Sequence, residues 1–358
     1  MADCSRQLQE QVRTASAERR ALAITGGGTK VFLGRRPVGE VLDVSAHRGI
    51  VSYQPVELVL TARAGTSLDV LEAALQEHGQ MLAFEPPHFG PGATLGGTLA
   101  CNLSGPGRPW WGSVRDQVLG IRLLNGRGEH LRFGGQVMKN VAGYDISRLQ
   151  AGAMGTLGVI TEISLKVLPQ PALTLTLVQA HPPATAITRM NQYAGEPRPL
   201  SAACWLDGRL YLRLSGAASA VQAAAGQWGG DRLAAAEATA FWSALREQQQ
   251  AFFQPALRGE TPLWRFSVRP NATLPELPGA WVLDWAGAQR WYRGTGEPAR
   301  METLAAAMGG QVTLFRNGER RAEVFHTLPG ALQTVQQRLK RQFDPAGIFN
   351  PGRVYGWL

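Results

Sequence analysis

The chain has 358 residues, of which 44% are hydrophobic, so it can bury a substantial core and form two domains. Lysine and arginine number 36 against 27 aspartates and glutamates, a formal net charge of +9. These cations are dispersed, without a basic helix or a basic and aromatic run, which argues against a nucleic-acid-binding protein. Three cysteines without CxxC spacing argue against a disulfide framework, a zinc site or an iron–sulfur cluster in this chain.

The N-terminal twenty residues are polar, and no apolar run approaches the length of a membrane span. We therefore expect no signal peptide, no transmembrane segment and a cytoplasmic location. Peripheral association with the inner face of a membrane stays open, because the chain is cationic.

A helix, a strand and a glycine-rich turn are predicted in succession at the start of the chain. Residues 5–21 place Leu8, Val12 and Ala15 on one helical face, and residues 21–25 resemble a strand. The strand leads into Gly26-Gly27-Gly28-Thr29-Lys30, whose glycines expose backbone N–H groups and whose lysine supplies a cation for phosphate. The spacing is neither GxxxxGK[ST] nor GxGxxG, which disfavours a nucleotide triphosphatase or a Rossmann domain.

Two strands and a helix are predicted between residues 41 and 79. Residues 41–44 and 57–62 are the strands, and the helix that follows carries Leu68, Leu71 and Leu75 on one face. Gly79 stands where a glycine commonly ends a helix.

The loop Pro86–Gly105, PPHFGPGATLGGTLACNLSG, consists mainly of small residues: fourteen of its twenty are glycine, proline, alanine, serine, threonine or cysteine. Glycines at 96 and 97 allow main-chain N–H groups to approach an anion. A third small-residue segment is GAMGTLG, residues 152–158. Together the three segments predict a pocket for a long diphosphate cofactor. For His88 in the loop we prefer a hydrogen-bonded loop histidine to a residue that contacts or carries the cofactor, because nothing nearby activates it.

Apolar and polar residues alternate in the middle of the chain, and this pattern predicts further strands. Residues 118–124 form a strand, Asn125-Gly126 predicts a tight hairpin into residues 129–133, and residues 159–167 form a long half-buried strand. Two prolines then mark a domain boundary. Between these strands, Lys139-Asn140 with Tyr144-Asp145 either reach a ligand or begin a helix.

Residues 172–327 predict a second domain with strands at 173–179, 200–206, 210–214, 263–268, 281–285, 289–291 and 311–315. Helices are expected at 217–227, at 233–249 and after Pro298. This pattern indicates a small α+β domain with one antiparallel sheet. We read its seven tryptophans as core. A helix at 328–343 follows.

In their order, GGGTK, PPHFGPGATLGG, GGQVMKNVAGYD and AGAMGTLGVITEISLKVLP resemble the PCMH-type FAD-binding domain of the vanillyl-alcohol-oxidase superfamily. Within that superfamily the chain is most similar to the glycolate oxidase E subunits. The resemblance implies an α+β protein with a two-lobed FAD-binding domain over residues 1–170. A smaller cap domain, of the kind that binds substrate, would follow over 171–327. Residues 328–358, which contain FDPAGIFNPGRV, would return to the FAD domain and place Asn350-Pro351-Gly352 near the cofactor.

Noncovalent FAD is the cofactor that the resemblance implies. Its pyrophosphate would lie on the backbone of residues 26–30, and the second segment would line the phosphates, ribose and inner flavin edge, with the third along the adenosine. The alternative is that these glycines serve turns and packing only, which explains each cluster but not their joint order. The implied residues are Gly26, Gly27, Gly28, Thr29, Lys30, Thr94, Gly96, Gly97, Asn102, Ser104, Gly105, Gly155, Gly158, Val159 and Ile160.

The chain departs from the catalytic members of the superfamily. They carry HxGDGNxH, which supplies a base and a metal, whereas the six histidines here lie more than six residues apart at 47, 78, 88, 130, 181 and 326. The family's GSEGTLG is replaced at Ala153-Met154. Arg265 and Arg269 could bind a carboxylate, but no base is visible, so we predict no catalytic residue and no metal site.

Three functions remain possible at this stage. The chain is an FAD-binding subunit of a glycolate oxidase complex, beside a catalytic flavin subunit and an iron–sulfur subunit; or a standalone D-2-hydroxyacid dehydrogenase; or a scaffold with a vestigial cofactor site. The first is favoured, because both the base and the cysteine clusters are missing from this chain.

Overall fold

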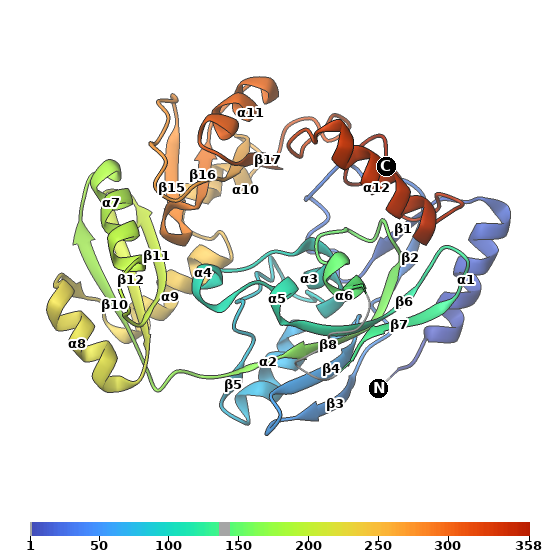
Figure 1. Ribbon diagram of the computed structural model, residues 1–358, viewed down its shortest axis with the longest axis horizontal. Coiled ribbons are helices and arrows are strands. Elements are labelled where there is room, and N and C mark those ends of the chain that lie inside the picture. Colours follow the sequence, from blue (N-terminus) through green and yellow to red (C-terminus); the bar gives the residue numbers. More distant parts are fainter. Residues whose placement is uncertain (1, 136–143) are drawn as a thin grey trace. The chain divides into compact units, whose positions relative to one another are not determined.

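The computed structural model describes residues 2–135 and 144–358 (Figure 1). The chain forms two compact units. Unit 1 comprises the residues up to Leu103, Ser113–Pro169 and Arg320–Leu358, and unit 2 comprises Ser104–Gly112 and Gln170–Glu319.

Two sheets organise most of unit 1. The strands β1 (Leu22–Thr25) and β2 (Glu40–Asp43) pair in parallel. Five further strands form an antiparallel sheet in the order β3-β4-β8-β6-β7. These are β3 (Ile50–Gln54), β4 (Val59–Arg63), β8 (Val159–Lys166), β6 (Val118–Leu124) and β7 (His130–Gly134), and a short pair joins β5 (Gln80–Met81) to β9 (Leu168–Pro169).

Two helices of unit 1 bury their apolar sides. Helix α1 (Ser5–Glu18) buries Leu8, Val12 and Ala15, as predicted, and helix α2 (Leu68–Gln76) buries its three leucines. Both contribute to one core together with the residues of β4, β6 and β8. The others are α3 (Leu95–Cys101), α5 (Val114–Gln117), α6 (Ile146–Leu149) and α12 (Gly330–Phe343).

The C-terminal segment joins the first strand of unit 1. The amide of Leu22 donates to the carbonyl of Ile348 at 2.7 Å, and that of Asn350 donates to the carbonyl of Leu22 at 2.9 Å. Figure 1 shows this segment beside β1 and β2. It follows that residues at the two ends of the chain contribute to one place in unit 1.

Unit 2 is built on one eight-stranded antiparallel sheet, in the order β13-β10-β12-β11-β15-β16-β14-β17. Its strands are β10 (Leu173–Ala180), β11 (Leu200–Leu206), β12 (Arg209–Gly216), β13 (Asp231–Arg232), β14 (Leu263–Ser267), β15 (Ala280–Asp284), β16 (Gln289–Arg293) and β17 (Gln311–Arg316). Its helices are α4 (Arg108–Trp111), α7 (Pro183–Ala194), α8 (Ala218–Trp228), α9 (Ala235–Arg246), α10 (Gln254–Leu257) and α11 (Pro298–Ala307), with single 3-10 turns at Ala251–Phe253 and Trp285–Gly287. The predicted single antiparallel sheet is confirmed.

Two local predictions were wrong or incomplete. The connection after β6 is not a two-residue turn at Asn125-Gly126: the side chain of Asn125 accepts from the amides of Arg127 and Glu129, and the left-handed residue is Gly128, at φ +70°. Helix α7 was not predicted, although a proline at its start and the apolar spacing of Ala186, Ile187 and Met190 were signals for it.

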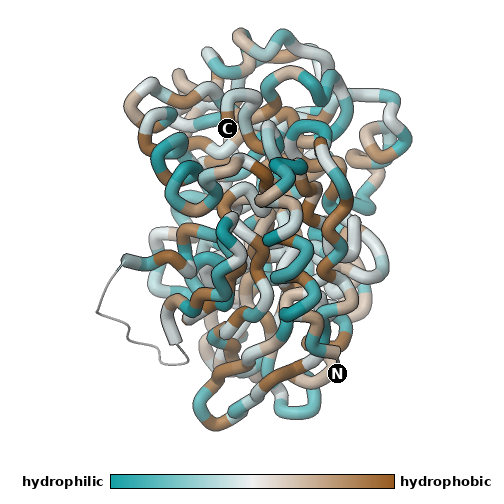
Figure 2. Tube along the Cα trace, turned by 90° about the vertical axis from the view of Figure 1, so that its right-hand side faces the viewer, coloured by the Kyte–Doolittle hydropathy of each residue, from teal (hydrophilic) through white to brown (hydrophobic). Residues whose placement is uncertain are grey.

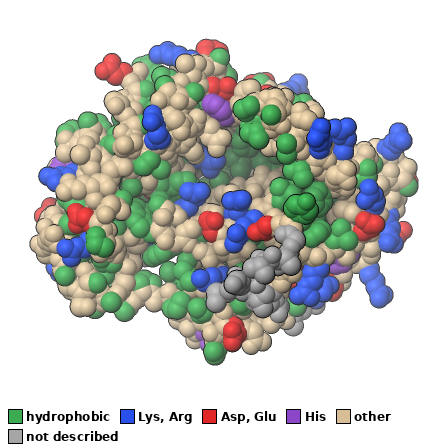
Figure 3. Space-filling view, viewed as in Figure 1, with side chains coloured by type: hydrophobic (Ala, Val, Ile, Leu, Met, Phe, Trp, Pro, Cys, Tyr) green, Lys and Arg blue, Asp and Glu red, His purple; other side chains and the backbone are tan. Residues whose placement is uncertain are grey.

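Apolar and polar residues are interspersed along the trace (Figure 2). Within the described residues, no helix combines the length and the apolar character needed to cross a membrane. Lysine and arginine side chains are scattered over the face seen in Figure 3, in agreement with their dispersal along the sequence.

Candidate functional site: a glycine-walled groove in unit 1

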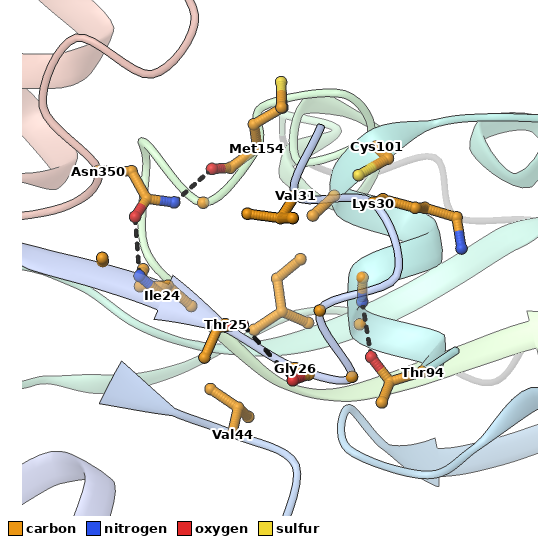
Figure 4. A pocket seen from close by; sticks show the side chains of 18 of the residues that line it. Ile24, Thr25, Gly26, Lys30, Val31, Val44, Thr94, Cys101, Met154 and Asn350 are labelled. Atoms are coloured by element: carbon orange, nitrogen blue, oxygen red, sulfur yellow. Dashed lines mark hydrogen bonds between the residues drawn. The ribbon is translucent and has the colours of Figure 1, made fainter. Parts of the chain in front are cut away.

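A groove in unit 1 brings together the three small-residue segments and the C-terminal segment (Figure 4). Its walls are the loop after β1, the start of α3, the segment before β8, and Asn350 with Arg353. The empty space of the groove, counted together with the open solvent at its mouth, is about 1150 Å³. Eleven predicted residues line it: Gly26, Gly27, Gly28, Thr29, Lys30, Thr94, Gly96, Gly97, Gly155, Gly158 and Ile160.

The glycine loop after β1 presents bare backbone to the groove. A Cβ on Gly27 would lie 1.7 Å from the carbonyl oxygen of Gly92, so no larger residue fits there. Gly28 has φ +70° with open space around it, so its requirement is conformational. Within the described part of the chain, the amides of Gly27, Gly28 and Thr29 donate no hydrogen bond. Three consecutive amides without an acceptor form a concave site suited to an anion.

The wall at the start of α3 contributes surface instead of donors. Thr94 caps the helix and accepts from the amide of Gly97 at 3.2 Å, and the amide of Gly96 donates to the carbonyl of Ala64 at 2.8 Å. A Cβ on Gly96 would lie 2.8 Å from that of Ala64, so this glycine serves close packing. The amides predicted to approach an anion at this wall are therefore already bonded within the protein.

Two cations and no carboxylate belong to the described lining of the groove. Lys30 is 7% exposed, and its Nζ lies 3.3 Å from the carbonyl oxygen of His88 and 3.4 Å from Oγ1 of Thr29. Arg353 is also buried and donates to the carbonyl oxygens of Arg35 and Val31, and its burial lowers its pKa. A buried cationic groove without acidic residues favours an anionic ligand over a neutral one.

Asn350 holds the third segment against β1. Its Nδ2 donates to the carbonyl of Met154 at 2.6 Å, and its Oδ1 accepts from the amide of Ile24 at 2.8 Å (Figure 4). Gly155 then lies so close that a Cβ would stand 2.7 Å from Nδ2 of Asn350. Sequence analysis expected Asn350 near the cofactor, and it lines the groove; Arg353, Met154 and Cys101 were not expected there.

Four predicted residues are outside the lining of the groove. Val159 is fully buried in the core of unit 1. Asn102 ends α3 in a left-handed conformation, and Ser104 and Gly105 belong to unit 2, where the carbonyl of Gly105 accepts from Nε1 of Trp285. Their predicted contact with a cofactor stays a prediction.

Buried polar atoms near the end of α3 lack hydrogen-bond partners. They include Oγ1 of Thr98, Oδ1 of Asn102 and the side-chain amide of Gln150. Thr98 and Asn102 lie one turn apart on α3, and the backbone of Gly152 packs against Asn102. None of these three side chains belongs to the described lining of the groove.

The burial of Cys101 raises the pKa of its thiol, while Lys30 and Arg353 act in the opposite direction. Burial is the larger effect, so the thiol that lines the groove is neutral.

His88 has carboxylate partners that its sequence neighbours did not indicate. Its Nδ1 lies 3.3 Å from Asp69 and its Nε2 lies 3.2 Å from Glu72, both on helix α2. His88 is a hydrogen-bonded loop histidine, as predicted. The expectation that it has no activating neighbour was wrong, because the fold brings the carboxylates of α2 to the loop. These three residues are close enough to hold a metal ion, a grouping that histidine spacing alone did not suggest. The two carboxylates face opposite nitrogens of the imidazole ring.

The remaining sequence candidates are dispersed. Lys139 and Asn140 lie outside the described residues, whereas Asp145 caps α6 by accepting from the amide of Arg148, so a helix begins there. In unit 2, Arg269 is exposed and its Nε donates to the carbonyl of Met308. Nε of Arg265 is buried without a partner, its guanidinium lies 5.4 Å from the ring centre of Phe315, and burial lowers its pKa to about 10.

Comparison with known proteins shows which class of protein the chain belongs to. Residues 2–134 match the model of the FAD binding domain, so the chain contains an FAD-binding domain and its cofactor is FAD. The fold resembles that of alkyldihydroxyacetonephosphate synthase, with a TM-score of 0.64 at 15% identity over 97% of this chain and 75% of that one. The predicted fold class, an FAD-binding domain of PCMH type with an antiparallel second domain, is confirmed.

The closer relationship is given by relatives in bacteria. The chain is 48% identical to the glycolate oxidase subunit GlcE of Escherichia coli (strain K12) over 99% of both chains. It belongs to the family of this glycolate oxidase subunit. It is also 33% identical to the glycolate oxidase subunit GlcD of Bacillus subtilis (strain 168), over 43% of this chain and 33% of that protein. A D-2-hydroxyglutarate dehydrogenase of Xanthomonas citri is 30% identical over 46% of this chain and 35% of that enzyme.

Proposed function

We propose that the chain is the FAD-binding subunit of a multi-subunit glycolate or 2-hydroxy acid oxidase. It holds FAD noncovalently in the groove of unit 1 and does not turn over substrate alone. The observation that carries the proposal is the groove itself, which combines three amides without acceptors, two buried cations and no acidic residue in its described lining. In this account residues 1–170 and 328–358 form the FAD-binding domain, and residues 171–327 are the cap domain.

Each wall of the groove has a distinct part in binding. The amides of Gly27, Gly28 and Thr29 donate to the pyrophosphate, and Lys30 and Arg353 compensate its charge. Asn350 fixes the segment at Gly155 against Ile24, so the groove keeps its width. When bound, FAD supplies a centre for two-electron oxidation and reduction.

The described lining of the groove lacks a general base for the oxidation of a 2-hydroxy acid. Removing the α-hydrogen of a 2-hydroxy acid requires a group that accepts the hydroxyl proton, and such a base contributes about 10² to 10⁴ in rate. The described lining of the groove holds no histidine, aspartate or glutamate. The proposal therefore assigns catalysis to a partner flavin subunit and electron transfer onward to an iron–sulfur subunit, in the cytoplasm or on the inner face of the membrane.

One observation favours the alternative of a standalone D-2-hydroxyacid dehydrogenase. Nε of Arg265 is buried and has no hydrogen-bond partner. Such a guanidinium nitrogen is available to donate to the carboxylate of a substrate. The third function, a scaffold with a vestigial site, is disfavoured because the groove retains its cations and amides.

The test is dye reduction by glycolate and D-lactate with three preparations: the purified chain alone, the flavin and iron–sulfur subunits of the same host without it, and all three together. We expect turnover from the complete set and none from the chain alone. Turnover by the isolated chain that Arg265→Met abolishes would establish the standalone enzyme. Full turnover by the partners without this chain would contradict its role as a required subunit.

A further inference from the structure

The loop that carries His88 lies against the glycine loop of the groove. A Cβ on Gly27 would collide with the carbonyl oxygen of Gly92, so the two backbones are in direct contact. The carbonyl oxygen of His88 lies 3.3 Å from Nζ of Lys30. His88 itself does not belong to the described lining. The conformation of residues 86–92 therefore affects how the lysine and the anion-binding amides of the groove are placed.

Phe89, the residue after His88, has an unfavourable backbone conformation. Its φ is +56°, in the left-handed region, where a residue with a large side chain is rare. Its ring meets that of Phe32 edge-on, with the ring centres 5.5 Å apart, and Nζ of Lys30 lies 5.8 Å from its own ring centre. A rotation of the peptide between His88 and Phe89 would relieve this φ and turn the carbonyl of His88 away from Lys30. Such a conformation persists only where its surroundings hold it, so the loop needs a firm anchor.

Helix α2 supplies an anchor through the side chain of His88. Nε2 of His88 is hydrogen-bonded to Oε1 of Glu72 at 3.2 Å, and Nδ1 lies 3.3 Å from Oδ1 of Asp69. The two carboxylates are three positions apart, so they share one face of the helix. The leucines on the other side of α2 are buried in the core of unit 1, so the carboxylates stand on a rigid element.

We propose that His88 is a positioning residue for FAD. Clamped between Asp69 and Glu72, its ring keeps the loop in the form in which the carbonyl of His88 accepts from Lys30, and the ammonium group of Lys30 stays at the groove. The inference rests on the proposed function, in which Lys30 compensates the charge of the pyrophosphate. It extends the cofactor site to two carboxylates on a helix outside the described lining.

Flavin fluorescence of the stripped full-length chain, titrated with FAD, tests the role of the ring. His88→Ala should raise Kd for FAD about tenfold, because Lys30 loses a fixed acceptor. His88→Asn keeps a donor close to the position of Nδ1 and should bring Kd back to within about threefold of wild type. In a chain that already carries Lys30→Met, His88→Ala should change Kd by less than about twofold, because both residues act on one contact.

Removal of the two carboxylates separates positioning from charge. Asp69→Asn/Glu72→Gln keeps the ring, and because these side chains are 68% and 36% exposed the variant should fold. The loss of two negative charges would by long-range electrostatics alone tighten the binding of an anion. The weaker clamp should instead raise Kd at least about threefold, since neutral acceptors form weaker hydrogen bonds than carboxylates. Glu77→Gln, exposed at the end of the same helix, is the matched control and should not raise Kd.

Every result of these titrations supports or overturns the clamp. Wild-type affinity in His88→Ala, or effects of His88→Ala and Lys30→Met that multiply independently, overturns the inference and leaves the proposed function standing. Should His88→Ala fail to fold, unchanged or tighter binding by Asp69→Asn/Glu72→Gln overturns it. If EDTA raises Kd of the wild-type chain and Mn²⁺ or Zn²⁺ restores it, the three residues hold a metal ion and the direct clamp is wrong. A wild-type chain that binds no FAD contradicts the proposed function itself.

Discussion

Replacing Gly97 by aspartate adds a negative charge to the groove and tests whether the groove binds the anionic pyrophosphate of FAD. Gly97 lies in the first turn of α3 and lines the groove. A Cβ added there would meet only Oγ1 of Thr94, at 3.1 Å, so a side chain can be accommodated with a small shift of that hydroxyl. An acidic residue in the first turn of a helix is favourable, so the unliganded variant should remain folded.

The carboxylate would oppose the pyrophosphate. For one phosphate charge about 5 Å away and an effective dielectric constant of about 20, Coulomb repulsion amounts to about 3 kcal/mol. That corresponds to a rise of about two orders of magnitude in Kd for FAD.

Flavin fluorescence of stripped protein titrated with FAD measures this change. Gly97→Ala is the matched control, because it adds the same Cβ without charge and should bind nearly as wild type. The difference between the variants should shrink in 1 M salt. A Kd for Gly97→Asp within threefold of that for Gly97→Ala would refute the placement of the pyrophosphate at this wall.

Three further predictions concern single groups of unit 1. Lys30→Met should raise Kd for FAD by about 10- to 100-fold, because it removes a charge-assisted hydrogen bond. Lys166→Met, outside the groove, should leave Kd unchanged. Equal affinities of Lys30→Met and wild type for FAD would exclude Lys30 as a phosphate ligand. Burial lowers the pKa of His47 and of His130, so the unfolded chain binds protons there that the folded chain does not, and the free energy of unfolding should fall as pH drops from about 7.5 to 5.5. Urea titrations should show a slope of at most about 1.4 kcal/mol per pH unit for each histidine, reduced by His47→Gln and unchanged by the exposed His78→Gln. Asp344→Ala should destabilise unit 1 by about 3–5 kcal/mol, because Lys340 stays buried without its carboxylate, and a loss below 1 kcal/mol in urea unfolding would contradict that pairing.

Periodicity was sufficient for most elements. The leucines of α2 specify their own burial, because one face of that helix is apolar and the other is not. The prediction that the strand at 159–167 is half-buried was wrong, because β8 is buried on both faces except at Glu162 and Lys166. Helix α7 was missed because no element was assigned to its residues, although its apolar spacing indicated a helix. The turn at Asn125 was misassigned because the side chain of Asn125, and not a tight backbone turn, accepts from the amides of the connection.

The groove was predictable only in part. Glycine clusters indicated three of its walls, since backbone exposure is visible in composition. The remaining wall depends on contacts between distant residues, such as Ile24 with Asn350, separated by 326 positions. The partners of His88 lie on the preceding helix, 16 and 19 positions upstream, and no local spacing rule connects them. The buried polar atoms of Thr98 and Gln150 carry no sequence signature at all, because only the folded chain decides which polar atoms lack a partner.

The central claim is that the groove of unit 1 holds one FAD without a covalent bond. Its most direct measurement is the ratio of flavin to protein in the supernatant after acid precipitation of the purified or FAD-reconstituted chain. We predict one FAD per chain, all of it released into the supernatant, and a lower ratio of FAD to protein for Gly97→Asp. Flavin that stays with the precipitated polypeptide would contradict noncovalent binding. A wild-type chain that takes up no FAD on reconstitution would contradict the claim as a whole.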